Sequence, residues 1–186
     1  MVEDYTDEEI RSVFETNLFG AIRTTRAALP TMRAQRSGTI IMVSSISGLR
    51  TFPFMSVYSA SKFALEAISS GLRYELRPFG IRVVLVEPGN FKTQGVVNMH
   101  IPERIRNGAK EGTSDPLYFQ LFEKYLRANQ NLTPGDAIDV ARVIASSVET
   151  PRPEARYLVG SDAEELMRVS DDEQEQMVMR VLDLSD

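Results

Sequence analysis

The sequence predicts an α/β fold in which three parallel strands are flanked by helices. Three short runs rich in Ile, Val and Leu, at residues 39–43, 81–86 and 156–159, have the length and composition of buried strands. The segments that connect them are far too long for hairpin turns, and each contains a helical pattern. Strands joined by such connections pair in parallel, through right-handed crossovers.

The N-terminal part of the chain predicts one long helix before the first strand. Thr6 and Glu9 form a capping-box pattern, which indicates a helix over residues 7–29. Pro30 should kink or end this helix, because proline lacks the backbone N–H that a helix requires. We expect a short helical continuation toward Arg36.

The rest of the chain alternates between helices and strands. Helices are expected over residues 56–77, 133–148 and 162–182. Pro78 and Gly80 should end the first of these helices. Residues 91–132 carry scattered glycines and prolines together with a group of aromatic residues.

The composition argues against several classes of function. A net charge of −5 disfavours a nucleic-acid partner, since binding to phosphates requires a basic surface. With no cysteine, the chain can form neither disulfides nor thiolate metal sites, and His100, the only histidine, argues against a multi-histidine metal site or a Ser-His-Asp hydrolase. No run approaches 18 apolar residues, so no membrane span is expected. We expect a cytoplasmic location, which the lack of cysteine fits.

Tyr58 and Lys62 are the most informative residues. Their four-residue offset places both side chains on one face of the 56–77 helix, one turn apart. A lysine at about 4 Å favours the phenolate by up to ~4 kcal/mol, which would bring the phenol pKa from ~10 toward neutral. Ser45, at the end of the 39–43 strand, can hold a substrate oxygen against that phenol. The spacing therefore predicts general acid/base chemistry at Tyr58.

These residues belong to a wider pattern. Its parts are Asn17 in Asn-Leu-Phe-Gly-Ala, Ser45 in Val-Ser-Ser-Ile-Ser-Gly, Tyr58 and Lys62 in Tyr-Ser-Ala-Ser-Lys, and Pro88-Gly89 followed by Thr93. On this pattern, nearly the whole chain resembles the short-chain dehydrogenase/reductase family. The segments Val86-Glu87-Pro88-Gly89 and Gly160-Ser161-Asp162-Ala163 resemble its 17β-hydroxysteroid-dehydrogenase-like branch.

The resemblance implies a Rossmann-type doubly wound parallel sheet, of which this chain supplies only the C-terminal portion. Its three strands would be the fifth, sixth and seventh of that sheet. The implied activity is NAD- or NADP-dependent hydride transfer between a secondary alcohol and a ketone. The segment with Pro88, Gly89 and Thr93 would contact the nicotinamide of the cofactor.

The resemblance also assigns roles to the four catalytic positions. Ser45 would orient the substrate oxygen; its neighbours Ser44 and Ser47 lack the thirteen-residue distance to Tyr58. Tyr58 would exchange the proton and, with Lys62, bind the cofactor, Lys62 holding the ribose hydroxyls and lowering the pKa of the phenol. Asn17 would mark a backbone kink and anchor a proton-relay water.

Substrate and assembly follow from the same resemblance. It places a substrate lid within residues 91–133, so the aromatic residues there are either ordinary core or part of that lid, and the resemblance favours the lid. Together with other apolar side chains they indicate a small hydrophobic alcohol or ketone as substrate. These side chains are Phe52, Phe54, Phe91, Met99, Tyr118, Phe119, Phe122 and Tyr125. A homodimer or homotetramer of the full-length form is expected, formed by the 7–29 and 56–77 helices.

One departure from the family pattern is as important as the match. The eleven glycines include no Gly-x-Gly, so the Gly-rich turn that receives the cofactor pyrophosphate in this family is not found. We therefore expect residues 1–186 to be a single partial domain, the catalytic half of a family member, and the 39–43 strand to have an unpaired edge. The alternative is a catalytically silent fragment that acts as an interaction module.

Overall fold

The computed structural model describes residues 2–93, 102–103, 105, 115–129 and 134–184. Its centre is a parallel sheet in the order β1-β2-β5, formed by β1 (Gly38–Val43), β2 (Ile81–Pro88) and β5 (Arg156–Val159). The register of β1 on β2 runs from Gly38 opposite Ile81 to Val43 opposite Val86. The predicted parallel α/β fold is confirmed, and β1 is one of the two outer strands of the described sheet.

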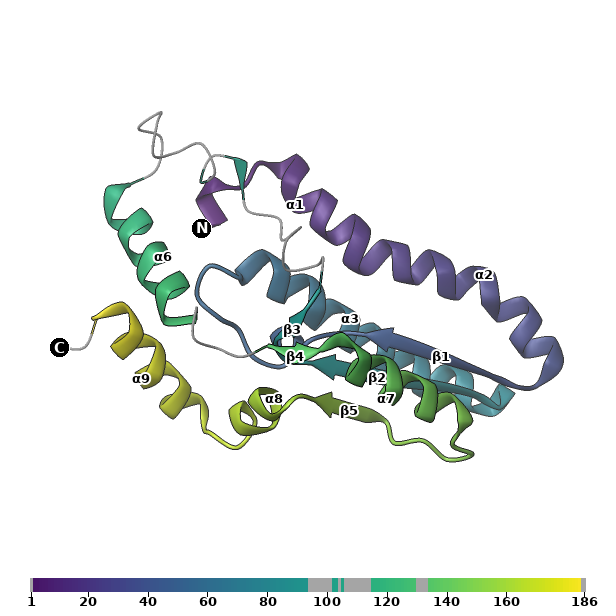
Figure 1. Cartoon of the computed structure of the whole chain (residues 1–186). Coiled ribbons are helices and arrows are strands. Elements are labelled where there is room, and N and C mark those ends of the chain that lie inside the picture. Colours follow the sequence, from purple (N-terminus) through teal and green to yellow (C-terminus); the bar gives the residue numbers. More distant parts are fainter. Residues whose placement is uncertain (1, 94–101, 104, 106–114, 130–133, 185–186) are drawn as a thin grey trace.

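Helices cover both faces of this sheet (Figure 1). One face packs against α1 (Asp7–Phe14), α2 (Gly20–Gln35) and α3 (Ser56–Leu76), and the other against α7 (Ala137–Glu149). Alternate residues of β2 supply the two cores, because successive side chains of a strand point to opposite faces. Val83 and Leu85 belong to the core under α2 and α3, and Val84 and Val86 to the core under α7. None of the described helices is long and apolar enough to cross a lipid bilayer.

The first helix continues through Pro30. Thr6 and Glu9 form the expected capping box, and α2 runs to Gln35, so the possible end near residue 29 does not occur, whereas the expected continuation toward Arg36 is confirmed. Pro30 cannot bond the carbonyl of Arg26, and both residues are exposed, so water can satisfy that carbonyl. The helix ends at Arg36, which adopts the left-handed conformation with φ 54°.

Short helical turns complete the N-terminal half. A π-helical turn, η2 (Glu15–Phe19), joins α1 to α2, so that the three segments form one continuous helix (Figure 1). Among the described residues, 3-10 turns are found at η1 (Val2–Asp4), η3 (Ile46–Gly48) and η4 (Arg77–Phe79). The last of these contains Pro78 and follows α3, which agrees with the predicted 56–77 helix to within one residue.

The C-terminal half contains elements that the sequence did not predict. Helix α6 (Pro116–Asn129) carries the aromatic group, and β3 (Phe91–Lys92) pairs in parallel with β4 (Gly135–Asp136). The single helix predicted over 162–182 is two helices, α8 (Ser161–Leu166) and α9 (Asp171–Leu182). A second helix begins because Ser170 and Glu173 form a capping box of their own. Met99, His100 and Thr133 lie outside the described residues.

Candidate active site

Ser45 and Tyr58 meet at the carboxyl edge of the sheet. Strand β1 ends at Val43, and Ser45 follows in an extended conformation that places its hydroxyl at the start of η3, where it accepts a hydrogen bond from the Ser47 N–H at 3.1 Å. Tyr58 lies in the first turn of α3, and its phenol is close enough to the Ser45 side chain for that side chain to lower the phenol pKa. The structure therefore brings together the pair that the sequence spacing predicted.

Asn17 is tied to the same helix through an intermediate serine. Its amide Nδ2 donates to Ser61 Oγ at 3.0 Å, and Ser61 Oγ donates to the Tyr58 carbonyl at 2.6 Å. Asn17 lies in the π-helical turn η2, where the regular helical bonding is interrupted. Such π-bulges are frequent at functional sites. This turn matches the backbone irregularity expected at Asn17, whereas the fully buried Ser61 was not predicted.

Lys62 does not act on Tyr58 as expected. Its Nζ donates to the Val43 carbonyl at 3.0 Å and lies 5.7 Å from the centre of the Tyr58 ring. Burial raises the pKa of Tyr58 above its ordinary value of 10.0, and the Ser45 side chain opposes this only in part. Burial also lowers the pKa of Lys62, against the charge of Glu66. The expected lowering of the phenol pKa toward neutral is therefore not found in this structure, because the loss of hydration on burial outweighs the opposing effect of Ser45.

The turn after β2 is held by backbone and side-chain contacts. The Gly89 N–H donates to the Val159 carbonyl at 2.8 Å, and the Asn90 N–H donates to Asp162 Oδ2 at 2.7 Å. A Cβ atom on Gly89 would lie 2.2 Å from Asp162 Oδ1, so a larger residue here would displace the Asp162 carboxylate. Because β1 and β2 are neighbours, Pro88 and Gly89 lie at the same edge of the sheet as Ser45.

Two further residues, Thr93 and Asp162, lie near the turn after β2 in the chain or in space. Thr93 is exposed and follows β3 directly, so it remains close in the chain to the turn that the sequence assigned to the cofactor. The sequence indicated Asp162 only as part of the Gly160-Ser161-Asp162-Ala163 segment. In the structure this segment contacts the turn after β2, because the Asp162 carboxylate accepts a hydrogen bond from the Asn90 N–H.

Two buried carboxylates, Glu66 of α3 and Glu87 of β2, share the half-exposed Arg156 of β5. Arg156 Nη1 donates to Glu66 Oε2 at 2.7 Å and also to Glu87 Oε1. Glu87 is 1% exposed, and burial together with the charge of Glu66 raises its pKa from 4.5 to about 7, against the opposing effect of Arg156. Sequence reasoning missed this group, although the position of Glu87 directly after an apolar strand was a signal for a buried carboxylate.

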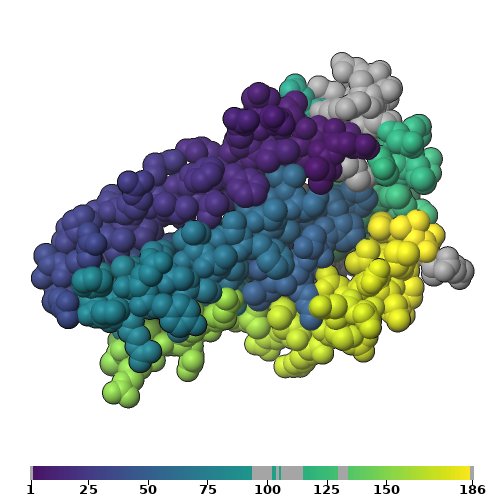
Figure 2. Space-filling view, turned by 180° about the vertical axis from the view of Figure 1, so that it is seen from behind, coloured from purple at the N-terminus to yellow at the C-terminus, as the bar shows by residue number. Residues whose placement is uncertain are grey.

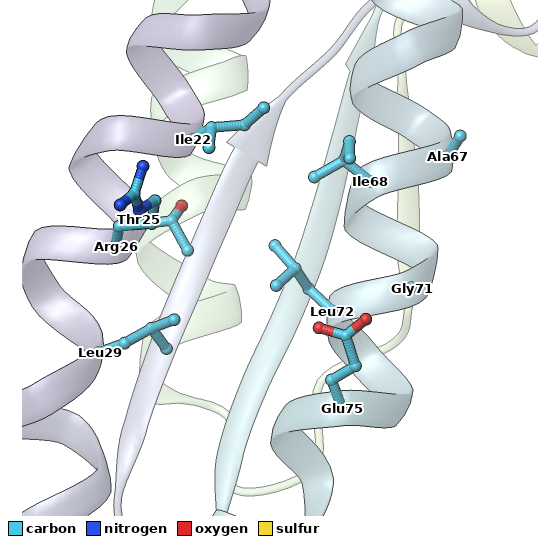
Figure 3. A pocket seen from close by; sticks show the side chains of 9 residues that line it. All are labelled: Ile22, Thr25, Arg26, Leu29, Ala67, Ile68, Gly71, Leu72 and Glu75. Atoms are coloured by element: carbon cyan, nitrogen blue, oxygen red, sulfur yellow. The ribbon is translucent and has the colours of Figure 1, made fainter.

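A separate groove of about 250 Å³ lies between α2 and α3 on the outer face (Figures 2 and 3). Figure 2 shows the purple α1–α2 helix and the blue-green α3 helix side by side on this face. The lining residues are mainly apolar or small: Ile22, Thr25, Arg26, Leu29, Ala67, Ile68, Gly71, Leu72 and Glu75. None of the predicted site residues is among them, so the groove is distinct from the catalytic edge.

Comparison with known proteins identifies the family. The model of the short chain dehydrogenase family matches residues 1–103, a span that contains Asn17, Ser45, Tyr58, Lys62 and the turn after β2. The chain belongs to the short-chain dehydrogenase family. The 17β-hydroxysteroid-dehydrogenase-like branch stays a prediction.

Two curated relatives illustrate the similarity. The chain is 41% identical over 146 residues to the uncharacterized oxidoreductase YusZ of Bacillus subtilis, covering 77% of this chain and 50% of the relative. It is 36% identical over 150 residues to retinol dehydrogenase 8 of Bos taurus, covering 79% of this chain and 47% of the relative. The chain thus spans about half the length of these curated relatives.

Solved structures agree with the fold. A short-chain dehydrogenase from Streptomyces avermitilis has a TM-score of 0.75 at 33% identity, over 96% of this chain and 62% of that one. A short-chain dehydrogenase/reductase from Burkholderia phymatum in complex with NAD has a TM-score of 0.63 at 26% identity, over 88% of this chain and 58% of that one. The Rossmann-type assignment of the sheet is therefore confirmed.

Proposed function

We propose that this chain forms the catalytic part of an NAD- or NADP-dependent oxidoreductase that interconverts a secondary alcohol and a ketone on a hydrophobic substrate. The observation that carries the proposal is the proximity of the Ser45 side chain to the Tyr58 phenol, with Lys62 one helical turn further on. A phenol paired with a hydroxyl can hold one oxygen atom of a substrate between two donors.

The chain's own residues fit the nicotinamide half of such a cofactor, which supplies or accepts the hydride when bound. Lys62 has three N–H donors, and the Val43 carbonyl accepts one of them, so donors are available for ribose hydroxyls. Asp162 holds the backbone of the turn at Asn90 and packs closely against Gly89, which fixes the course of the segment that would meet the nicotinamide. Support also comes from the Burkholderia phymatum relative, which is described in complex with NAD.

Tyr58 would begin the reduction of a ketone as the acid. Its raised pKa keeps the phenol protonated at neutral pH, so Tyr58 can give its proton to the substrate oxygen while the Ser45 hydroxyl donates a hydrogen bond to the same oxygen. Lys62 would hold the ribose and place a positive charge beside the phenolate that forms. Asn17 would keep Tyr58 in position through Ser61.

The substrate class rests on the aromatic side chains around this edge. Phe54 packs against Phe122 and Tyr125 of α6, with ring centres 5.3 and 5.6 Å apart. Phe91, which the sequence grouped with these side chains, is buried between Gly135 and Gly160 and belongs to the core, so we do not expect it to contact a substrate. We assign α6 to a substrate-covering region within residues 91–133, in line with the hydrophobic alcohol in the name of the bovine relative, retinol dehydrogenase 8.

A homodimer or homotetramer is part of this proposal. The groove between α2 and α3 and the exposed Phe63 and Tyr74 of α3 give this outer face an apolar character. Two copies related by a two-fold axis would cover it with their helices.

Substitution of Tyr58 by phenylalanine tests the proposed chemistry. In the longest form of the protein that contains these residues, Tyr58→Phe should reduce turnover of steroid, retinoid or acyl ketones by ~10² to 10⁴, because proton transfer is lost while the ring still packs. Ser45→Ala should reduce turnover strongly, whereas Ser44→Ala, the matched control one residue away, should reduce it only slightly. Turnover by Tyr58→Phe within about threefold of the parent would refute the assignment.

The alternative, a silent interaction module, has one observation in its favour. Within the described residues β1 pairs with β2 alone, and Val43 at its end is 44% exposed, so the other edge of β1 is open to a partner strand. A chain that forms stable complexes through this edge but shows no turnover with any ketone would support that alternative.

A further inference from the structure

The segment between the two catalytic residues Ser45 and Tyr58 is anchored to the C-terminal helix. Residues 49–55 connect η3 to α3, and Arg50 within them is only 11% exposed despite its charge. Arg50 Nη2 donates to the Val169 carbonyl at 2.7 Å, and its Nη1 donates to Asp171 and, at 3.2 Å, to Gln174. Gln174 Nε2 returns a hydrogen bond to the Thr51 carbonyl at 2.9 Å. A planar guanidinium suits such a set of divergent acceptors, which one ammonium group cannot reach together.

The same segment carries an aromatic side chain in a fixed orientation. Phe54 has φ 64°, a left-handed conformation that is unfavourable for a residue with a Cβ. Its ring meets Phe122 edge to face, at an interplanar angle of 74°, and also contacts Tyr125. These two aromatic contacts stabilise the ring in this orientation and offset the cost of the backbone conformation.

The two helices that hold this segment are themselves joined. Figure 1 shows α6 and α9 side by side, at the end of the molecule toward which the strands of the sheet point. Lys124 Nζ of α6 contacts Asp183 Oδ2, just after α9, at 2.8 Å. Arg50 is thus fixed to α9, Phe54 to α6, and α6 to α9, which closes a ring of contacts around the 49–55 segment.

We propose that Arg50 is a positioning residue that sets substrate specificity, by holding Phe54, Phe122 and Tyr125 together as an apolar wall beside Ser45 and Tyr58. This inference rests on the proposed function and adds its selectivity. The charge of Arg50 is satisfied by Val169, Asp171 and Gln174, so the wall offers a substrate aromatic rings and the Tyr125 hydroxyl but no cation. A ketone with an aromatic or alkyl group next to its carbonyl would bury that group on the wall, whereas an equivalent substrate with a carboxylate would lose hydration without a charged partner there.

Two ketones with the same phenylbutane skeleton test this selectivity. They are 4-phenyl-2-butanone, which is uncharged, and 2-oxo-4-phenylbutyrate, which carries a carboxylate. In Arg50→Met the preference in kcat/KM for the uncharged ketone should fall about tenfold, through KM, with kcat nearly unchanged. Arg50→Lys keeps the charge but loses the planar guanidinium with its several donors, so its preference for the uncharged ketone should lie between those of the parent and Arg50→Met. Arg168→Met, at an exposed arginine that pairs with Glu164, is the control and should show the preference of the parent.

A second readout does not depend on catalysis. The chain has no tryptophan, so Phe122→Trp places a single fluorescent reporter on the wall. In this background Arg50→Met should at least double the rate of acrylamide quenching of the tryptophan. Titration of the two ketones, followed by the tryptophan emission, should show that the preference in Kd for 4-phenyl-2-butanone over 2-oxo-4-phenylbutyrate falls about tenfold.

The outcomes separate this inference from the proposed function. In one outcome the parent turns over neither ketone yet binds the uncharged one selectively, with a selectivity that is lost in Arg50→Met. This result would support the inference about Arg50 and refute the proposed oxidoreductase activity. Unchanged quenching together with unchanged selectivity in Arg50→Met would overturn the inference. So would a parallel loss of kcat with both ketones, since a purely structural role predicts that pattern.

Discussion

Replacing Glu87 by glutamine should remove a pH dependence of stability between about pH 4.5 and pH 7. Glu87 has a pKa of about 7 in the folded chain, against an ordinary value of 4.5. The folded state therefore binds the proton of this carboxyl more tightly than the unfolded state does. The resulting stabilisation is fully present below pH 4.5 and is lost as the pH rises toward and through 7.

The magnitude follows from the difference between the two pKa values. A difference of this size is worth at most about 3 kcal/mol in the free energy of unfolding. Arg156 is 40% exposed, so water screens part of its interaction with the carboxylate, and we expect a change of about 1 to 3 kcal/mol. Glutamine carries no charge at any pH and keeps an oxygen that can accept from Arg156, so the dependence should disappear rather than reverse.

Urea unfolding of the parent and of Glu87→Gln at several pH values from 5 to 8 measures the effect. The advantage of the parent over the variant at low pH should shrink or change sign by pH 8. Glu149→Gln, at an exposed glutamate at the end of α7, is the matched control and should follow the parent at every pH. If the parent and Glu87→Gln differ by the same amount at pH 5 and pH 8, the reasoning about the buried carboxylate is refuted.

Three further predictions concern catalysis, the cofactor and assembly. Because the pKa of Tyr58 is raised, ketone reduction should vary little between pH 6 and 8 while alcohol oxidation speeds up with pH; oxidation as fast at pH 6 as at pH 9 would contradict this. Residues 1–186 alone should bind NADH and NADPH with a Kd above about 50 μM by isothermal titration, since losing ~4 kcal/mol of pyrophosphate contacts weakens binding about a thousandfold; tighter binding would show that a Gly-rich turn is dispensable. Ile68→Glu, in the groove between α2 and α3, should convert a dimer into a monomer in light scattering at tens of micromolar while the exposed-site variant Arg152→Glu does not, and a monomeric parent would rule out the interface.

Patterns within short stretches of sequence predicted much of the fold. The β5 strand was predicted at its observed residues, and α3 to within one residue, because apolar runs and helix-ending residues act locally. The pair of Ser45 and Tyr58 was also predictable, since a strand end and the first turn of the following helix are held at a fixed place by the parallel crossover.

Contacts between distant segments could not be predicted in this way. Arg50 and Gln174 are 124 residues apart, and nothing in either local sequence indicates the other. The raised pKa of Tyr58 is a second example, because it depends on how much protein surrounds the phenol and not on the spacing to Lys62. Pro30 is a third, since whether a proline ends a helix depends on the exposure of its surroundings.

The π-helical turn at Glu15–Phe19 makes the length of the first helix as important as its composition. A π-turn accommodates one residue more than a regular helical turn, and each residue of an α-helix rotates the chain by about 100°. Deleting one residue here would let the turn become regular and would swing α1, with its Thr6 cap, about a quarter of a circle around the axis of α2. Asn17 of this turn bonds Ser61 and its neighbour Leu18 lies in the core, so the extra residue lets these two contacts coexist with the packing of α1 against α3.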